Sequence, residues 1–340
     1  MRLRKVLPAA ALALLTVAAA ACGKPAAAGG GSTDQPAGSM SLTIGYTAIG
    51  AAYSDLYVCE DQGVFKKNGL DVKLTLLNSS SQLFAAIASN SVQIGAGVAR
   101  TTAAGALGGI DLRYLALPIP KYYVEMWGKS DITSPDQLKG KKIGLSSPGS
   151  LGDASLDAFL KEKGWTAKDV QKTFLKSTPA EVTALQSGAV DVIMTQPPTG
   201  TTTRNFGAHK IMDFTKYPAA ANAYTASAAW VTANGPAVDA FVKSEAECLS
   251  ILHKNRDQAI DSIRKHSGSD DPDLAAYSYD FFEPLWAKVP TVDPALLQQA
   301  FAEAAADTNA AAPADVSKYI DNAPLQTLQS NGFIDSLYKS

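Results

Sequence analysis

The sequence predicts an α/β protein with two lobes, each a mixed, mainly parallel sheet flanked by helices. Short apolar strands alternate with amphipathic helices from Leu42 onward, and a second series of the same kind starts at Lys142. Roughly 300 residues follow the N-terminal segment, which is more than a single hydrophobic core comfortably holds. Two lobes are therefore expected.

The first series contains four strands separated by helices. Strands are predicted at 42–46, 70–77, 92–95 and 112–117, and helices at 53–67, 83–89 and 99–107. Asn68-Gly69 ends the first helix before the next strand begins. Because helices join the strands, the strands are expected to run parallel, with helices on both faces of the sheet.

The second series repeats this pattern. Strands are predicted at 122–128, 143–145, 172–175, 190–194, 210–214 and 224–232, with helices that start near 134, 150 and 178. Ile143-Gly144 matches Ile44-Gly45 of the first series, which supports two similar lobes. The rest of the chain is mostly helical, with helices predicted at 241–252, 256–266, 274–285, 294–306 and 325–331.

The N-terminal segment is typical of an exported protein. Three basic residues precede an apolar run over 6–21, so we predict a secretory signal peptide at 1–21. Residues 19–22 also resemble the bacterial lipobox, in which the cysteine, here Cys22, becomes the lipidated first residue. Cleavage without lipidation is the alternative. Residues 22–40 are rich in Ala, Gly, Ser and Pro and are predicted to be a flexible tether.

Charge and cysteine content narrow the class of protein. The formal net charge of −2 and the absence of a basic run argue against a nucleic-acid partner. Cys59 and Cys248 are the only cysteines after Cys22. In an oxidising compartment they can pair and close a long loop, or they can be two small buried residues. Both interpretations remain open.

The loop 146–149 connects a buried strand to the helix that starts at Ser150. The unpaired N–H groups of that helix's first turn, together with its dipole, favour an anion or a strong acceptor. Ser147, Ser150 and the N–H groups around Leu151 are therefore predicted to form one wall of a ligand pocket. The alternative is an ordinary strand-to-helix turn with a serine cap.

Several segments, taken in order, resemble a known family. They are residues 42–46, 63–72, 134–144 and 185–192. Together they resemble the extracytoplasmic solute-binding proteins of ABC importers, in the branch that binds sulfonates, nitrate or thiamine-type pyrimidines. The resemblance implies a type II periplasmic-binding-protein fold, in which two lobes close on a ligand about two hinge strands.

The resemblance also implies lobe boundaries and pocket residues. With hinge strands near 125–129 and 227–233, lobe 1 is expected to comprise 41–126 and 231–340, and lobe 2 to comprise 127–230. Pocket walls are expected in the loops after strands and at the helix starts. The predicted ligand-binding residues are Thr47, Tyr53, Ser80, Arg100, Thr101, Tyr122, Ser147, Ser150, Leu151 and Gln196.

These residues have different predicted roles. Arg100 is predicted to hold an anionic group through its planar guanidinium, and the alternative is a solvated arginine paired with a neighbour. Tyr53 and Tyr122 can stack on the ligand or can belong to the core. Gln196 is expected to exchange hydrogen bonds with the ligand.

No catalytic, metal or cofactor site is predicted. His209, His253 and His266 lack metal-ligand spacing, and no residue shows a nucleophile–base arrangement. We expect a monomeric receptor, anchored to the bacterial cell membrane by a lipid on Cys22, that captures a small organic solute and delivers it to an ABC permease. The alternatives are an enzyme on the same fold that forms or transfers a pyrimidine, and a ligand-sensing accessory protein.

Overall fold

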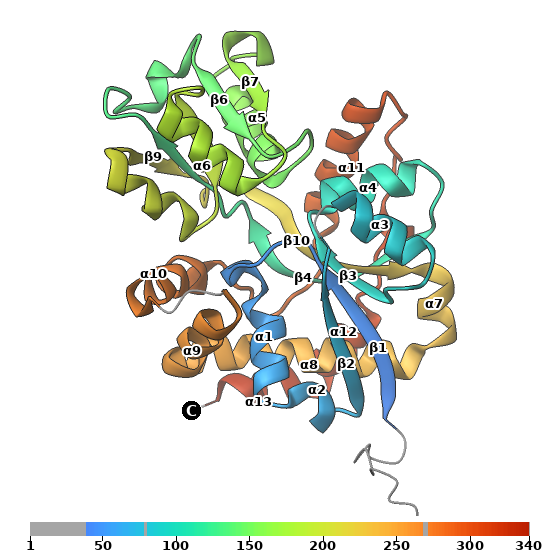
Figure 1. Cartoon of the computed structure of the whole chain (residues 1–340). Coiled ribbons are helices and arrows are strands. Elements are labelled where there is room, and N and C mark those ends of the chain that lie inside the picture. Colours follow the sequence, from blue (N-terminus) through green and yellow to red (C-terminus); the bar gives the residue numbers. More distant parts are fainter. Residues whose placement is uncertain (1–38, 78–79, 268–270, 340) are drawn as a thin grey trace, which may run out of the picture. The chain divides into compact units, whose positions relative to one another are not determined.

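The computed structural model describes residues 39–77, 80–267 and 271–339 (Figure 1). The predicted signal peptide, Cys22 and the tether up to residue 38 lie outside these described residues. The strand that follows the tether begins at Met40.

The first of two five-stranded sheets has the order β2-β1-β3-β10-β4. Its strands are β1 (Met40–Tyr46), β2 (Leu70–Leu76), β3 (Ile94–Gly97), β4 (Leu112–Lys121) and β10 (Pro218–Ser227). β1 pairs in parallel with β2 and β3, whereas β10 is antiparallel to β3 and β4. In β1, Leu42 and Ile44 are buried and Ser41 is exposed, so the alternation of apolar and polar residues matches the side chains that face the core and the solvent.

The second sheet has the order β7-β6-β8-β5-β9. Its strands are β5 (Glu125–Gly128), β6 (Lys142–Leu145), β7 (Gln171–Phe174), β8 (Val192–Thr195) and β9 (His209–Asp213). β6 is parallel to β7 and β8, and β5 is antiparallel to β8 and β9. Each sheet therefore has a single reversed strand, β10 in the first and β5 in the second. The prediction of two mixed sheets flanked by helices is confirmed.

Helices cover both sheets. The α-helices are α1 (Ser54–Asp61), α2 (Val64–Lys67), α3 (Ser80–Ala88), α4 (Ala99–Leu107), α5 (Leu151–Glu162), α6 (Thr178–Ser187), α7 (Ala228–Ala233), α8 (Gly235–Lys254), α9 (Arg256–Ser267), α10 (Pro272–Phe282), α11 (Pro294–Thr308), α12 (Ala323–Ser330) and α13 (Phe333–Tyr338). The 3₁₀ helices are η1 (Ala51–Tyr53), η2 (Pro135–Leu138), η3 (Ala167–Asp169), η4 (Thr199–Phe206), η5 (Glu283–Leu285) and η6 (Ser317–Tyr319). The predicted helix 53–67 is divided into η1, α1 and α2, and Gly63, between α1 and α2, has a left-handed φ of 66°.

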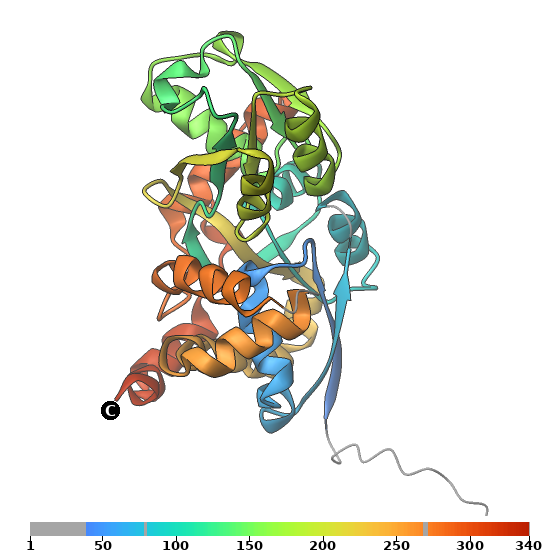
Figure 2. The same cartoon turned by 60° about the vertical axis from the view of Figure 1, so that its left-hand side comes forward.

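We call each sheet with its covering helices a lobe. In the first lobe, α8 and α9 pack against α1 (Figure 2), and α11 packs against α4 and β10. In the second lobe, α5 and α6 contact β8. Val192 and Met194 of β8 join the core cluster that contains α5, whereas Ile193 joins the cluster that contains α6, so these two helices cover opposite faces of the sheet.

The positions where the chain passes between the sheets correct the predicted boundaries. The first connection is 122–124, between β4 and β5, and the second is 214–217, between β9 and β10. The hinge strands predicted near 125–129 and 227–233 are instead β5 of the second sheet and α7. Residues 218–227, predicted to lie in lobe 2, pair in the first sheet. The predicted strand 224–232 ends at Ser227, whose hydroxyl caps α7 by accepting from the Trp230 N–H at 3.2 Å.

Candidate functional site

A small cavity lies where the two lobes meet. It is lined by Val98, Arg100, Tyr122, Ala154, Ala219, Ala220, Leu296, Gln299, Ala300 and Glu303. These residues come from α4 and the residue before it, the first connection, α5, the start of β10 and α11. The volume is about 10 Å³, which is enough for one water molecule. An organic ligand would therefore enter only after the lobes or their side chains move apart.

Arg100 is the cation of this cavity, and its guanidinium is engaged by two carboxylates. Nε and Nη2 donate to Asp307 of α11 at 2.7 and 2.6 Å. Nη1 and Nη2 also lie 3.4 Å from Asp157 Oδ2, on α5 of the other lobe. Burial alone would lower the pKa of Arg100, but the bonds to Asp307 raise it. The predicted anion clamp is thus already paired within the protein.

The start of α5 is also occupied by a carboxylate of this chain. The Gly149 N–H donates to Asp153 Oδ2 at 2.9 Å, and Ser150 Oγ caps the helix by accepting from the Asp153 N–H at 3.4 Å. Lys172 Nζ joins Asp153 to Asp157, at 2.6 and 2.5 Å. The expectation of a helix end that awaits an external anion therefore needs correction, because Asp153 supplies a negative charge there.

A second group of predicted residues lies on the loop before α1. Thr47 Oγ1 and Tyr53 Oη are 2.8 Å apart, and the Asn222 side chain of β10 holds this segment by donating to the Ala52 carbonyl at 2.9 Å. A Cβ atom placed on Gly50 would lie 3.9 Å from Gln196 Oε1, so the loop approaches Gln196 of the second lobe. This approach makes Thr47 and Gln196 candidates for a shared wall between the lobes, whereas Tyr53 is buried in the hydrophobic core.

The remaining predicted residues have distinct positions. Tyr122 is buried and lines the cavity, whereas Leu151 belongs to the hydrophobic core. Thr101 is half-buried in the first turn of α4, and Ser147 is exposed. Ser80 begins α3, but its side chain lies outside the described part of the structure. The ligand roles of these residues stay predictions.

Sequence reasoning missed a polar cluster beside the first connection. Glu125 of β5 is fully buried and accepts from Trp127 Nε1 at 3.0 Å. The Tyr277 hydroxyl, on α10 of the first lobe, also donates to Glu125, and Lys210 Nζ lies 3.1 Å from its carboxylate. These contacts could not be predicted from the local sequence, because Tyr277 is 152 residues away from Glu125 along the chain. The available signal was a glutamate within the otherwise apolar strand predicted at 122–128.

Gly200 of η4 is expected to be essential for packing against Trp127. A Cβ atom at this position would lie 1.9 Å from Trp127 Nε1, and Trp127 is fully buried. Gly200→Ala is therefore expected to destabilise the protein by ~1–3 kcal/mol or more through overpacking. Gly235→Ala is the matched control, because a Cβ at Gly235 meets nothing within 4 Å. Thermal unfolding that is equal for both variants would contradict this prediction.

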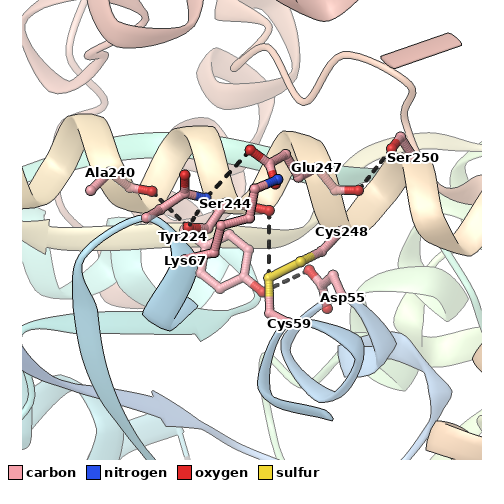
Figure 3. The surroundings of a disulfide bond; sticks show 10 residues. Asp55, Cys59, Lys67, Tyr224, Ala240, Ser244, Glu247, Cys248 and Ser250 are labelled. Atoms are coloured by element: carbon pink, nitrogen blue, oxygen red, sulfur yellow. Dashed lines mark hydrogen bonds and ion pairs between the residues drawn. A yellow bond between two sulfur atoms is a disulfide. The ribbon is translucent and has the colours of Figure 1, made fainter. Parts of the chain in front are cut away.

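Behind the loop before α1, two fully buried acids lie between α1 and α8. The Tyr224 hydroxyl donates to Asp55 Oδ2 at 2.6 Å (Figure 3). Burial raises the pKa of Asp55. Burial also raises the pKa of Glu245, and the nearby charge of Asp55 raises it further. The Cys59–Cys248 disulfide joins the same two helices, with an S–S distance of 2.09 Å. Of the two interpretations that the sequence left open, the disulfide is confirmed.

One cluster in the described residues has the composition of a weak metal site. Glu60, Asp61 and His266 each offer a ligand atom within 4.8 Å of the others. However, Asp61 already accepts from Lys265 and Ser262, and the His266 ring stacks on Tyr57 at 4.4 Å. These contacts give the cluster a structural role, and no metal function is assigned to it.

The chain belongs to the NMT1/THI5-like family, whose pattern matches residues 51–259, more than half of the sequence. A search of curated proteins found no match. In the described ranges, no helix combines the length and hydropathy that a bilayer crossing requires.

Solved structures show the same fold at low sequence identity. The aliphatic sulphonate binding protein SsuA from Escherichia coli is 19% identical with a TM-score of 0.71, covering 84% of this chain and 99% of its own. The alkanesulfonate-binding protein SsuA from Xanthomonas axonopodis pv. citri, bound to MOPS, is 19% identical with a TM-score of 0.69, covering 83% and 98%. A cysteine-to-serine mutant of DSZB in complex with biphenyl-2-sulfinic acid is 16% identical with a TM-score of 0.65, covering 86% and 99%. The chain thus has the periplasmic-binding-protein fold.

Proposed function

We propose that this protein is the solute-binding component of an ABC importer and that it holds a small organic solute between its lobes. The observation that carries the proposal is the cavity at the lobe interface, which is lined by residues of both lobes and of the first connection. Family membership and the fold shared with sulfonate-binding proteins support it. In such a receptor, hinge motion exposes the site and closure buries the ligand.

The proposal includes export and anchoring. A lipid on Cys22 would hold the folded body near the membrane through the tether 22–40, where it can meet the permease as a monomer. Cys22→Ser is expected to move the protein from the membrane fraction to the soluble extracytoplasmic fraction, because the acyl chains would be lost. Immunoblotting of cell fractions measures this shift. An unchanged distribution would refute lipid anchoring and leave solute binding untouched.

The alternative is an enzyme on the same fold. The disulfide occupies both Cys59 and Cys248, so the described residues contain no free thiol to serve as a nucleophile. This observation favours binding over cysteine-based catalysis.

Native mass spectrometry after exposure to a small-molecule extract tests the two functions against each other. A receptor is expected to release, on denaturation, a compound of unchanged mass that is also present in the extract. Conversion of that compound during incubation would instead establish an enzyme. If no compound is retained by the folded protein, the proposed function is wrong.

A further inference from the structure

The charged groups around the interlobe cavity are mostly acidic. Two cations, Arg100 and Lys172, lie in one connected cluster with the carboxyl groups of Asp153, Asp157, Asp307 and Glu303. Among the described residues that line the cavity itself, Arg100 is the only cation. The cluster therefore carries an excess of negative charge, even though an arginine faces the cavity.

Arg100 has little capacity left for an anionic ligand. Its side chain is 7% exposed. Its bidentate contact with Asp307 uses Nε and Nη2, the pair of donors that could otherwise bind a sulfonate or carboxylate. The remaining face of the guanidinium points to Asp157 at 3.4 Å, across the lobe interface. An incoming anion would have to displace one of these carboxylates or share the guanidinium with it.

The helix end on the opposite lobe does not offer a replacement. The Asp153 carboxylate accepts from the Gly149 N–H in front of α5. Its side chain is only 6% exposed, so water screens it poorly. A second negative charge at this helix end would be repelled by Asp153 at short range, and the nearby cation Lys172 is already shared between Asp153 and Asp157.

We propose that this cavity discriminates against anions and takes an uncharged or cationic group that donates hydrogen bonds. The inference rests on the proposed function and specifies its ligand class. Gln299 and Glu303 offer acceptor oxygens at the cavity, and Gln299 Nε2 donates to Glu303 Oε1 at 2.8 Å. The ligand chemistry is therefore unlike that named for the sulfonate-binding relatives, although the fold is the same.

The test compares two probes of similar shape and different charge. Isothermal titration calorimetry measures binding of butane-1-sulfonate and of the uncharged butane-1-sulfonamide, whose NH₂ group donates hydrogen bonds, to the full-length protein. Wild type is expected to show no saturable sulfonate binding. In Asp157→Asn/Asp307→Asn, which releases Arg100, sulfonate is expected to bind saturably, with an affinity at least about tenfold above the detection limit set by wild type, because two repelling carboxylates are gone. The sulfonamide is expected to bind wild type saturably and to bind the double variant with about the same affinity.

Controls separate charge from folding. Asp111→Asn removes a carboxylate of the same type, paired with Arg113 at 2.5 Å outside this cluster, and is expected to leave sulfonate affinity unchanged. Circular dichroism and thermal unfolding confirm that each variant is folded. If the double variant does not fold, Asp157→Asn alone is used, because Asp157 is partly exposed on α5 and Asp307 still anchors Arg100. Its expected gain is smaller and has the same sign.

Two results would overturn the proposal. One is saturable sulfonate binding by wild type that Arg100→Ala abolishes. This result would support solute binding but would refute the proposal that the cavity discriminates against anions. The other is a folded charge-neutralised variant without any gain in sulfonate affinity. The proposed function fails on a different result, the absence of any retained small molecule in the extract experiment.

Discussion

Replacing Cys59 and Cys248 together by alanine is expected to lower the free energy of unfolding by about 2–5 kcal/mol. The disulfide joins positions separated by 189 residues, and a cross-link over so long a loop restricts the unfolded chain strongly. It also connects α1, which follows the Thr47–Tyr53 loop, to the long helix α8 (Figure 3). Guanidinium unfolding of the non-reduced proteins at one pH measures the difference.

A reducing agent provides the matched control for this experiment. It should lower the stability of wild type toward that of the double variant and leave the double variant unchanged, because Cys22, the third cysteine of the sequence, has no role in this cross-link. Equal unfolding midpoints for non-reduced wild type and the variant would show that the bond contributes nothing to stability.

Wild-type stability is expected to fall as the pH rises, and Glu245→Gln is expected to make this fall smaller. The folded pKa of Glu245 is raised, so the folded state binds its proton more tightly than the unfolded state. This contribution is fully present below the unfolded pKa of about 4.3 and is lost above it, at ~1.4 kcal/mol per pH unit until the folded pKa is reached. Glutamine keeps the shape, can donate to Asp55 and does not titrate in this range.

Urea unfolding between pH 5 and pH 8 measures the effect. Wild-type stability should fall across this interval, and the Glu245→Gln curve should be flatter and lie above it at the alkaline end. Glu247→Gln is the control, because Glu247 is on the same helix but pairs with Lys67 at 2.7 Å. This variant keeps Asp55 and Glu245, so its stability should still fall between pH 5 and pH 8. Parallel curves for wild type and Glu245→Gln would mean that Glu245 is not a group whose titration lowers the stability.

Local patterns predicted most elements well where the apolar period was strong. The helix predicted at 99–107 is α4 with the same bounds, and the strand predicted at 172–175 is β7, shifted by one residue. The return strand β10 was placed too late because it begins with Pro218, Ala219, Ala220 and Ala221, and proline and alanine carry little strand signal. Pairing with β3 and β4 decides that these residues form a strand.

The candidate site was predicted less completely than the fold. Arg100 was identified as a cavity residue by its position after β3, but its partner Asp307 is 207 residues away. The contact between Glu125 and Tyr277 is similarly distant. The sequence around Arg100 and around Glu125 does not reveal these distant partners. The partner decides whether the charged side chain is available to a ligand.

The sequence by itself determined the two alternating α/β series and the candidate cysteine pair, because these features depend on short-range period, capping and composition. Only the tertiary structure decided where the chain crosses between the sheets, that the two cysteines are bonded, and that Arg100 is surrounded by carboxylates. Those outcomes depend on which distant elements pack together, since ion pairs and strand pairing are set by distance in space and not along the chain.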